Sequence, residues 1–333
     1  MPGAGEYHYK KAKKSMKPSI RSRQSNWIRS VKKQPADAFT LTELLVVIGT
    51  LALLALLFVP ALAGTKTDTL RLQCQNNLKQ LQVGFQLFAQ DHNDMYPPAG
   101  WANNAGTQMA WDCWINRYIG GNLSDGTMQS GVVFVGQGNQ ALSIEVCPAD
   151  TFPKVTFVGG NSPWFALRSY AMNAVGPSQG TGYQVTDQNQ SYPLPDLNKA
   201  SMHGVGIYWN DTGSGAPDWN ARGYKTSVVR DPAGTILLCE NTHGQQIALN
   251  IWTCVCIGPQ GTGALYQIDP AAKAQDPNSS VNQNEGSLLY QAHQNVFNYA
   301  FHDGHVAALK IEQTVGTGTL TAPKGMWTVV PRD

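Results

Sequence analysis

Residues 38–64 of the chain read AFTLTELLVVIGTLALLALLFVPALAG. From position 44 to position 59 every residue is apolar except Thr50 and the small Gly49. The segment Leu44–Ala63 contains 20 residues, and an α-helix of that length spans roughly 30 Å, the thickness of the hydrocarbon core of a bilayer. The sequence therefore predicts a helix that spans a membrane once.

The charge on the two sides of this segment predicts its orientation. Before Phe39 there are ten basic and two acidic residues, a balance of +8, and from Phe39 onward there are 14 basic and 20 acidic residues, a balance of −6. By the positive-inside rule the N-terminus lies in the cytoplasm and the rest of the chain outside it. The acidic balance of that larger part argues against a nucleic-acid partner.

Two ordinary explanations of the apolar segment leave one residue unexplained. A cleaved secretory signal peptide has a shorter apolar region, although Ala61-Leu62-Ala63 offers a small-residue cleavage site. A plain membrane anchor fits the length. Neither explains Glu43, an acid at the edge of the apolar run, and ionisable groups within membrane segments are costly and commonly functional.

A resemblance to a known family accounts for Glu43. Residues 38–48 closely resemble the prepilin processing site of type IV pilins and type II secretion pseudopilins. In that family a dedicated peptidase cuts just before the Phe and methylates its new amino group. The resemblance implies cleavage between Ala38, where family members usually carry Gly, and Phe39. Glu43 then becomes the fifth residue of the mature chain and Pro60 the twenty-second, where pilins commonly carry Pro.

The same resemblance implies a function and a location. It predicts a structural subunit, a pseudopilin or minor pilin of a type II secretion or type IV pilus-like machine, and not an enzyme. Its partners would be the prepilin peptidase and other pilin or pseudopilin subunits. It would lie in the inner membrane with a periplasmic head, which becomes extracellular once assembled. In the assembly, the buried Glu43 would pair with the free amine of a neighbouring Phe39, because a buried charge needs a partner.

The predicted helix continues beyond the membrane segment. Thr67-Asp68 offers a cap or restart, and the helix should end at residues 91–94, before Pro97-Pro98. A helix from Phe39 to about Gln90 would be roughly 78 Å long. One apolar face has helical spacing and consists of Leu70, Cys74, Leu78, Leu81, Phe85 and Phe88.

The organisation that follows is α+β and pilin-like. It comprises a basic leader at 1–38, a membrane and assembly helix at 39–65, its amphipathic continuation at 66–94 and a β-rich head at 95–333. The continuation should pack on an antiparallel sheet with large loop insertions. The candidate strands are 131–135, 142–146, 155–158, 168–172, 204–209, 226–229, 235–239, 246–251, 263–268, 295–301, 305–311 and 326–330.

A hairpin is predicted within residues 293–311. Two alternating runs flank Asp303-Gly304, a preferred pair for a two-residue hairpin turn. His302 and His305 would then face each other across the first pair of residues, where they could hold a metal or simply be two solvated side chains.

The hairpin carries a second resemblance. His293 followed by nine residues and Asp303-Gly304 matches the C-terminal H-x(9)-D-G motif of prepilin-like proteins abundant in Planctomycetes- and Verrucomicrobia-type bacteria. Segments 74–81, 147–150 and 169–173 resemble the same family. A strand between His293 and Asp303 would keep them roughly 23 Å apart, so a direct catalytic pair is not expected. Asp303 is predicted to serve the turn and His293 to anchor the strand.

No cofactor is predicted. Calcium is the weaker alternative, because nothing has the regular acidic spacing of a calcium loop. Asp150 is the candidate for calcium, and the weak candidates for any metal are His302, Asp303, His305 and Asp150.

The cysteines and tryptophans leave further alternatives open. Outside the cytoplasm disulfides are allowed, and one or two are expected, with the remaining thiols buried; a zinc site is the rival, although there is no Cys-x-x-Cys. Several of the head's tryptophans lie in Gly- and Asn-rich sequence and suit either a core or a polysaccharide surface. The alternative function is therefore an exported polysaccharide-binding protein; no motif supports a hydrolase. The six cysteines are Cys74, Cys113, Cys147, Cys239, Cys254 and Cys256.

Overall fold

The computed structural model describes most of the chain from Phe39 onward. The described ranges are 39–133, 140–151, 165–175, 184–186, 203–211, 219, 223–242, 247–251, 254–256, 258–259, 285–320, 322–331 and 333. Three predicted segments lie outside the described residues: the leader 1–38, which includes Ala38, and the strands 155–158 and 263–268. The chain divides into two units, Met1–Ala55 and Leu56–Asp333.

One long helix, α1, runs from Leu41 to Asp91, as the sequence predicts. It ends where Asn93 and Asp94 adopt positive φ. Among the described residues, no helix has the length and hydropathy needed to cross a membrane. The predicted span includes residues 56–63, whose side chains lie outside the described part of the chain.

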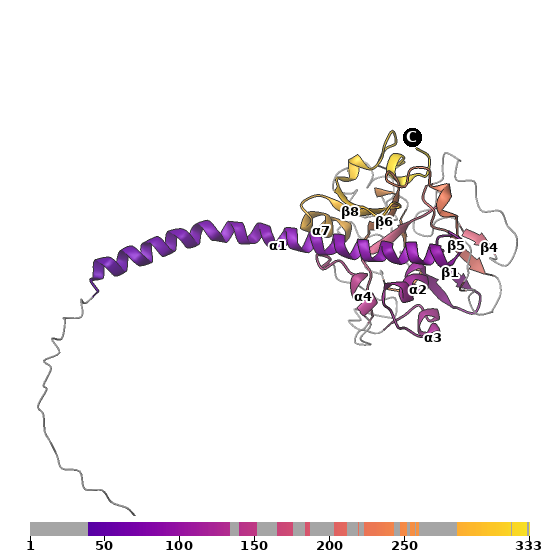
Figure 1. Ribbon diagram of the computed structural model, residues 1–333, viewed down its shortest axis with the longest axis horizontal. Coiled ribbons are helices and arrows are strands. Elements are labelled where there is room, and N and C mark those ends of the chain that lie inside the picture. The colour runs from indigo at the N-terminus through magenta and orange to yellow at the C-terminus, as the bar shows by residue number, and fades with distance from the viewer. Residues whose placement is uncertain are drawn as a thin grey trace, which may run out of the picture. The chain divides into compact units, whose positions relative to one another are not determined.

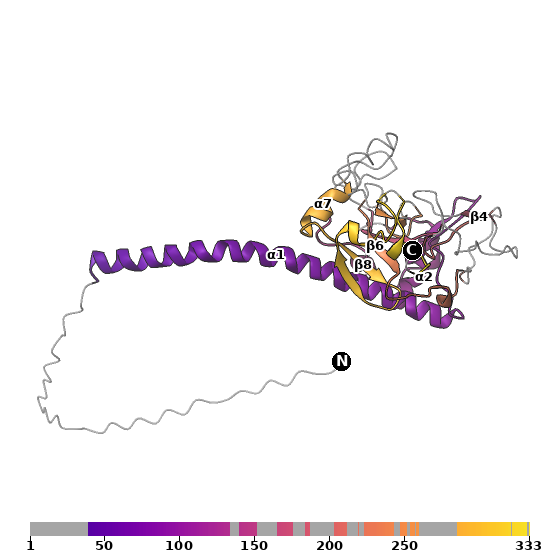
Figure 2. The ribbon, with the colours of Figure 1, turned by 90° about the horizontal axis from the view of Figure 1, so that it is seen from above.

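The apolar stripe of α1 in the second unit is buried against a five-stranded sheet. Cys74, Leu78, Leu81 and Phe85 are fully buried, and the C-terminal part of α1 lies against the sheet in two views (Figures 1 and 2). The strands follow the order β7-β3-β6-β8-β9. Their bounds are β3 Tyr170–Asn173, β6 Ile236–Glu240, β7 Val255–Cys256, β8 Phe297–Phe301 and β9 Val306–Leu309.

The two faces of β8 have different neighbours. The Gln75 side-chain amide of α1 donates to Asn298 Oδ1 at 3.0 Å. The next residue, Tyr299, packs edge-on against Trp327, because successive side chains of a strand point to opposite faces. Both faces are thus covered, which is why every residue of β8 is buried.

A second, four-stranded sheet follows the order β2-β1-β5-β4. It contains β1 Gly100–Asn103, β2 Gln108–Ala110, β4 Gln184–Thr186 and β5 Tyr208–Asp211. β5 pairs in parallel with both β1 and β4, and in the first sheet β7 is parallel to β3. The expectation of a wholly antiparallel sheet is therefore wrong, although the α+β class with a long helix packed on a sheet is confirmed.

Short helices connect these strands. They are α2 Trp111–Ile115, η1 Asn116–Ile119, α3 Asp125–Gln129, α4 Gln140–Ile144, η2 Thr226–Val228, α7 Glu285–Ala292, η4 Ile311–Gln313 and η5 Gly325–Trp327.

Three predicted strands are helical instead. Segments 142–146, 226–229 and 326–330 overlap α4, η2 and η5, because periodicity does not separate a short apolar run in a helix from one in a strand. The described part of the predicted strand 246–251 is not a strand. It has one isolated bridge, between Leu167 and Ile247, followed by a turn.

Candidate functional site

The N-terminal end of α1 is held by a capping box. The Thr40 backbone N–H and hydroxyl donate to Glu43 Oε2 at 2.9 and 2.7 Å, and the Glu43 N–H donates to Thr40 Oγ1 at 3.3 Å. This reciprocal arrangement satisfies two backbone donors at the helix start. The signal was present in the sequence as Thr40-x-x-Glu43, so Glu43 has a local role in addition to the predicted assembly role.

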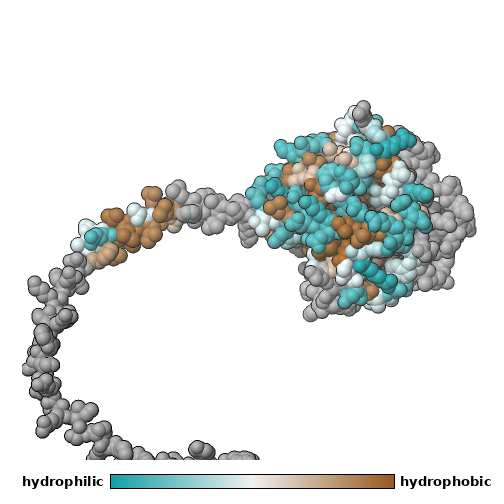
Figure 3. Space-filling view, viewed as in Figure 1, coloured by the Kyte–Doolittle hydropathy of each residue, from teal (hydrophilic) through white to brown (hydrophobic). Residues whose placement is uncertain are grey.

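The helix that follows this cap presents bare apolar side chains. Leu41 is 78% exposed, Leu53 64% and Phe39 73%, and Figure 3 shows the apolar residues gathered on this segment. Contiguous apolar surface of this kind marks a site of contact with lipid or with another protein.

The hairpin turn differs from the predicted one. The Phe301 N–H donates to the His305 carbonyl, the Gly304 N–H donates to the Phe301 carbonyl, and Gly304 has φ +107°. This is a three-residue loop with glycine at the bulge position, and it comprises His302, Asp303 and Gly304. The predicted two-residue turn is wrong because the positive φ of Gly304 adds one residue to the loop.

The same bulge separates the two histidines. His302 is buried, and its Nδ1 lies 2.7 Å from the Tyr96 hydroxyl; burial lowers the pKa of His302 to about 3. His305 stacks on Phe301, and its Nδ1 lies 2.6 Å from Asp303 Oδ1. The predicted pairing of His302 with His305 on one face is therefore wrong.

Asp150 lies in a turn of its own. Its N–H donates to the Cys147 carbonyl at 2.9 Å, and its Oδ2 accepts from the Ser169 hydroxyl at 2.6 Å. The structure shows it in a turn, the role that the sequence favours over calcium binding.

His293 and Asp303 lie at opposite ends of β8. His293 is fully buried, and its Nδ1 lies 3.0 Å from Glu240 Oε2. Asn298 fixes the same carboxylate, donating from its backbone N–H at 2.7 Å and from its side-chain amide at 2.8 Å. Sequence reasoning missed Glu240; the signal was an acid ending the apolar strand Ile236–Glu240.

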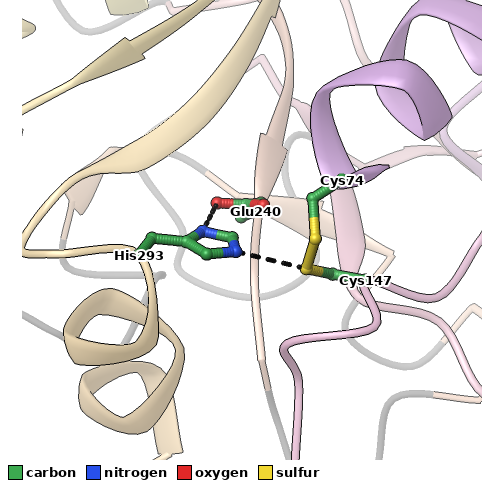
Figure 4. A group of neighbouring side chains, drawn as sticks. All are labelled: Cys74, Cys147, Glu240 and His293. Atoms are coloured by element: carbon green, nitrogen blue, oxygen red, sulfur yellow. Dashed lines mark hydrogen bonds and ion pairs between the residues drawn. A yellow bond between two sulfur atoms is a disulfide. The ribbon is translucent and has the colours of Figure 1, made fainter. Parts of the chain in front are cut away.

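This cluster contacts a disulfide (Figure 4). Cys74 of α1 is bonded to Cys147, with their Cα atoms 4.9 Å apart, and His293 Nε2 lies 3.4 Å from Cys147 Sγ. In the part of the chain that the structure describes, Cys74, Cys147, Glu240 and His293 form the group with metal-ligand spacing. The other cysteines, which are buried thiols, are Cys113, Cys239, Cys254 and Cys256.

A second buried polar cluster joins three segments. Arg168 donates to Asp112 Oδ2 at 2.6 Å and to the Asn250 carbonyl at 3.0 Å. Glu145 lies beside Asp112, and burial together with that negative charge raises the pKa of Glu145 well above its usual value. All three side chains are inaccessible to solvent, so the cluster lies in the interior of the head, where it does not meet a substrate.

An aromatic pocket opens beside the end of α1. It encloses about 360 Å³. Trp114 and Trp219 meet edge-to-face at 6.3 Å, and Arg117 lies 6.0 Å above the Trp219 ring. The pocket is lined by Phe88, His92, Cys113, Trp114, Arg117, Tyr118, Met128 and Trp219.

Comparisons with protein-family models, curated proteins and solved structures gave no match for this chain. Its function is therefore inferred from its own residues and geometry.

Proposed function

We propose that the chain is a pilin-like structural subunit, a pseudopilin or minor pilin that assembles through its N-terminal helix. The observation that carries the proposal is the start of α1. An exposed apolar helix begins with Glu43 in its first turn, immediately after the processing-site sequence Ala38-Phe39. A plain anchor would use the acid only for its capping box with Thr40, whereas an assembling subunit also gives its charge a partner.

The fold supports the proposal. A long helix with one face of its second half buried on a sheet, and with apolar side chains exposed on residues 41–54, is the arrangement that a subunit of a helical filament requires. The apolar part would lie first in lipid and then among identical helices. The proposed location is the inner membrane, with the N-terminus in the cytoplasm and the head outside.

Glu43 would exchange one partner for another during assembly. In the single chain its carboxylate accepts from Thr40. Among neighbouring helices the same carboxylate would accept from the methylated amine of an adjacent Phe39, which exists only after the leader is removed. A charge-assisted hydrogen bond of this kind is about twice as strong as a neutral one.

Cleavage of the leader tests the proposal. With a C-terminal tag, the full chain is expected to lose residues 1–38 in cells that contain a prepilin peptidase, and to keep them when the peptidase is inactive. Ala38→Gly should be cleaved at least as well as the wild type, whereas Ala38→Trp should remain uncut because the site needs a small residue. The measurement is the band shift on an immunoblot. Equal cleavage with and without the peptidase would contradict the proposal.

The aromatic pocket favours a second candidate function, polysaccharide binding by the head. Trp114, Trp219 and Tyr118 offer rings, and Arg117 and His92 offer polar groups. Amphipathic rings of this kind are enriched where a binding surface is partly apolar and partly wet.

Replacing one ring tests that second function. The full chain is expected to bind a panel of soluble polysaccharides, and Trp219→Ala should weaken binding about 30-fold, as for a tryptophan that contributes about 2 kcal/mol. Leu72→Ala, at an exposed residue outside the pocket, should bind as the wild type does. The measurement is affinity electrophoresis. Unchanged binding by Trp219→Ala, or none by the wild type, would remove this candidate.

A further inference from the structure

Four ligand-type side chains converge where α1, β6 and α7 approach each other (Figure 4). Cys74 comes from α1, Cys147 from the turn after α4, Glu240 from the end of β6 and His293 from the turn after α7. One ligand atom of each lies within 4.8 Å of the others. All four residues are fully buried.

The imidazole of His293 has an unused nitrogen aimed at this point. Because Nδ1 faces the Glu240 carboxylate at 3.0 Å, we assign the ring proton to Nδ1, which leaves the Nε2 lone pair facing Cys147 Sγ at 3.4 Å. A disulfide sulfur carries no proton and cannot donate to Nε2. A buried nitrogen without a donor costs free energy, and reduction of the disulfide would offer it a partner, either a thiol proton or a metal ion held by the two thiolates.

The separation of the ligand atoms fits zinc. With usual zinc–sulfur and zinc–nitrogen distances, a thiolate and an imidazole nitrogen on one tetrahedral zinc lie about 3.5 Å apart, and two thiolates about 3.8 Å. The observed Nε2–Sγ distance of 3.4 Å is already close to the first value. Two bonded sulfurs lie about 2 Å apart. After reduction they are free to separate toward the spacing of about 3.8 Å that two thiolates have on one zinc.

The surroundings supply the outer support that metal-bound histidines need. Metal-ligating histidines usually donate their other N–H to a carboxylate, which fixes the ring and its tautomer. Glu240 has that position, and Asn298 holds it with two hydrogen bonds from 2.7 to 2.8 Å. The histidine is thus oriented without the metal being present.

We propose that Cys74, Cys147 and His293 form a redox-gated zinc site, closed in the disulfide state and open after reduction, with Glu240 orienting His293. A dithiol or a phosphine supplies two electrons and the medium two protons, so that the S–S bond becomes two thiols. Zn²⁺ then binds both sulfurs as thiolates and releases the two protons. Zinc neutralises the two thiolate charges, which a buried site would not otherwise tolerate. The inference does not depend on the pilin-like role.

Metal content measured in the two redox states tests the site. The full chain in detergent is reduced with a phosphine, mixed with Zn²⁺, desalted without oxygen and measured by mass spectrometry of the metal. About one zinc per chain is expected after reduction, and essentially none in the oxidised protein. Co²⁺ in place of zinc should give a sulfur-to-metal charge-transfer band only after reduction.

Variants separate a metal site from a purely structural disulfide. Cys147→Ser and His293→Gln should lose zinc, whereas Cys113→Ser, at a buried thiol outside the cluster, should keep it. Glu240→Gln should weaken zinc binding about 10- to 100-fold, as outer-shell changes do. Equal zinc in both redox states, zinc retained by His293→Gln, or a reduced chain that unfolds or binds no zinc would each overturn the proposal.

Discussion

Glu43→Val and Glu43→Gln are both expected to insert into the membrane, to lose the leader and to be excluded from assembled filaments. Insertion should persist because either change removes a charge from an apolar helix. Cleavage should persist because the cut lies four residues earlier. Assembly should fail because the amine of an adjacent Phe39 would be buried without its carboxylate, at a cost of about 3–5 kcal/mol. That corresponds to at least about a 100-fold loss of incorporation.

Comparison of Glu43→Gln with Thr40→Val separates the role of Glu43 in assembly from its role in capping the helix. Gln occurs at the same position of capping boxes, so Glu43→Gln keeps the hydrogen bonds to Thr40 but loses the charge. Thr40→Val does the opposite, because it removes the hydroxyl that bonds to Glu43 and keeps the carboxylate.

The measurement is the sheared, extracellular fraction of tagged protein at matched membrane levels. The account expects both Glu43 variants to be absent from that fraction and Thr40→Val to be present. Incorporation of Glu43→Gln at the wild-type level, with loss of Thr40→Val, would show that the cap matters and the charge does not.

Asp112→Asn and Glu145→Gln should change the stability of the head in opposite directions. Asp112 carries the charge that pairs with buried Arg168 and also accepts from the Leu249 N–H at 2.7 Å. Breaking a buried ion pair by removing one partner costs about 3–5 kcal/mol. Glu145→Gln instead replaces a carboxyl whose burial favours the protonated form, so the change should be neutral at low pH and stabilising at higher pH.

The sign of the pH dependence follows from the raised pKa of Glu145, which burial causes first and the charge of Asp112 second. Above about pH 4.5 the unfolded chain releases the Glu145 proton while the folded chain keeps it. The free energy of unfolding therefore falls as pH rises through this window, by at most about 1.4 kcal/mol per pH unit. Because a glutamine side chain does not titrate, Glu145→Gln should remove this pH-dependent fall in the free energy of unfolding.

Denaturant unfolding at pH 5 and pH 8 measures both effects. The free energy of unfolding of Glu145→Gln, relative to that of the wild type, should be larger at pH 8 than at pH 5. Glu312→Gln, at an exposed acid, should show no such increase. A wild type and a Glu145→Gln variant with the same pH dependence would mean that Glu145 is ionised in the folded protein. Asp112→Asn as stable as the wild type would mean that the ion pair is not needed.

The long helix could be predicted because its signal is local and repeated. The stripe that contains Leu78, Leu81 and Phe85 recurs at helical spacing, and the structure buries these residues. The hairpin of β8 and β9 could also be predicted, since two alternating runs flank Asp303-Gly304. The turn itself was not, because one positive φ at Gly304 separates a two-residue loop from a three-residue loop.

The buried clusters could not be predicted because their partners are far apart in sequence. Arg168 meets Asp112 across 56 residues, and His293 meets Glu240 across 53. Asp112 lies within an apolar run and Glu240 ends one, whereas Arg168 and His293 each have a polar neighbour, and a single sequence does not say which of the four will meet. The capping box, by contrast, is a local signal, because Thr40 and Glu43 lie within four residues of each other.

The mass of the mature N-terminus is the most direct test of the pilin-like account. The protein is extracted from membranes of cells with an active prepilin peptidase, and its N-terminal peptide is sequenced by tandem mass spectrometry. The account predicts a chain that begins at Phe39 with one methyl group on its α-amine. A chain that keeps residues 1–38, or one cut after Ala63 as by a signal peptidase, would contradict it.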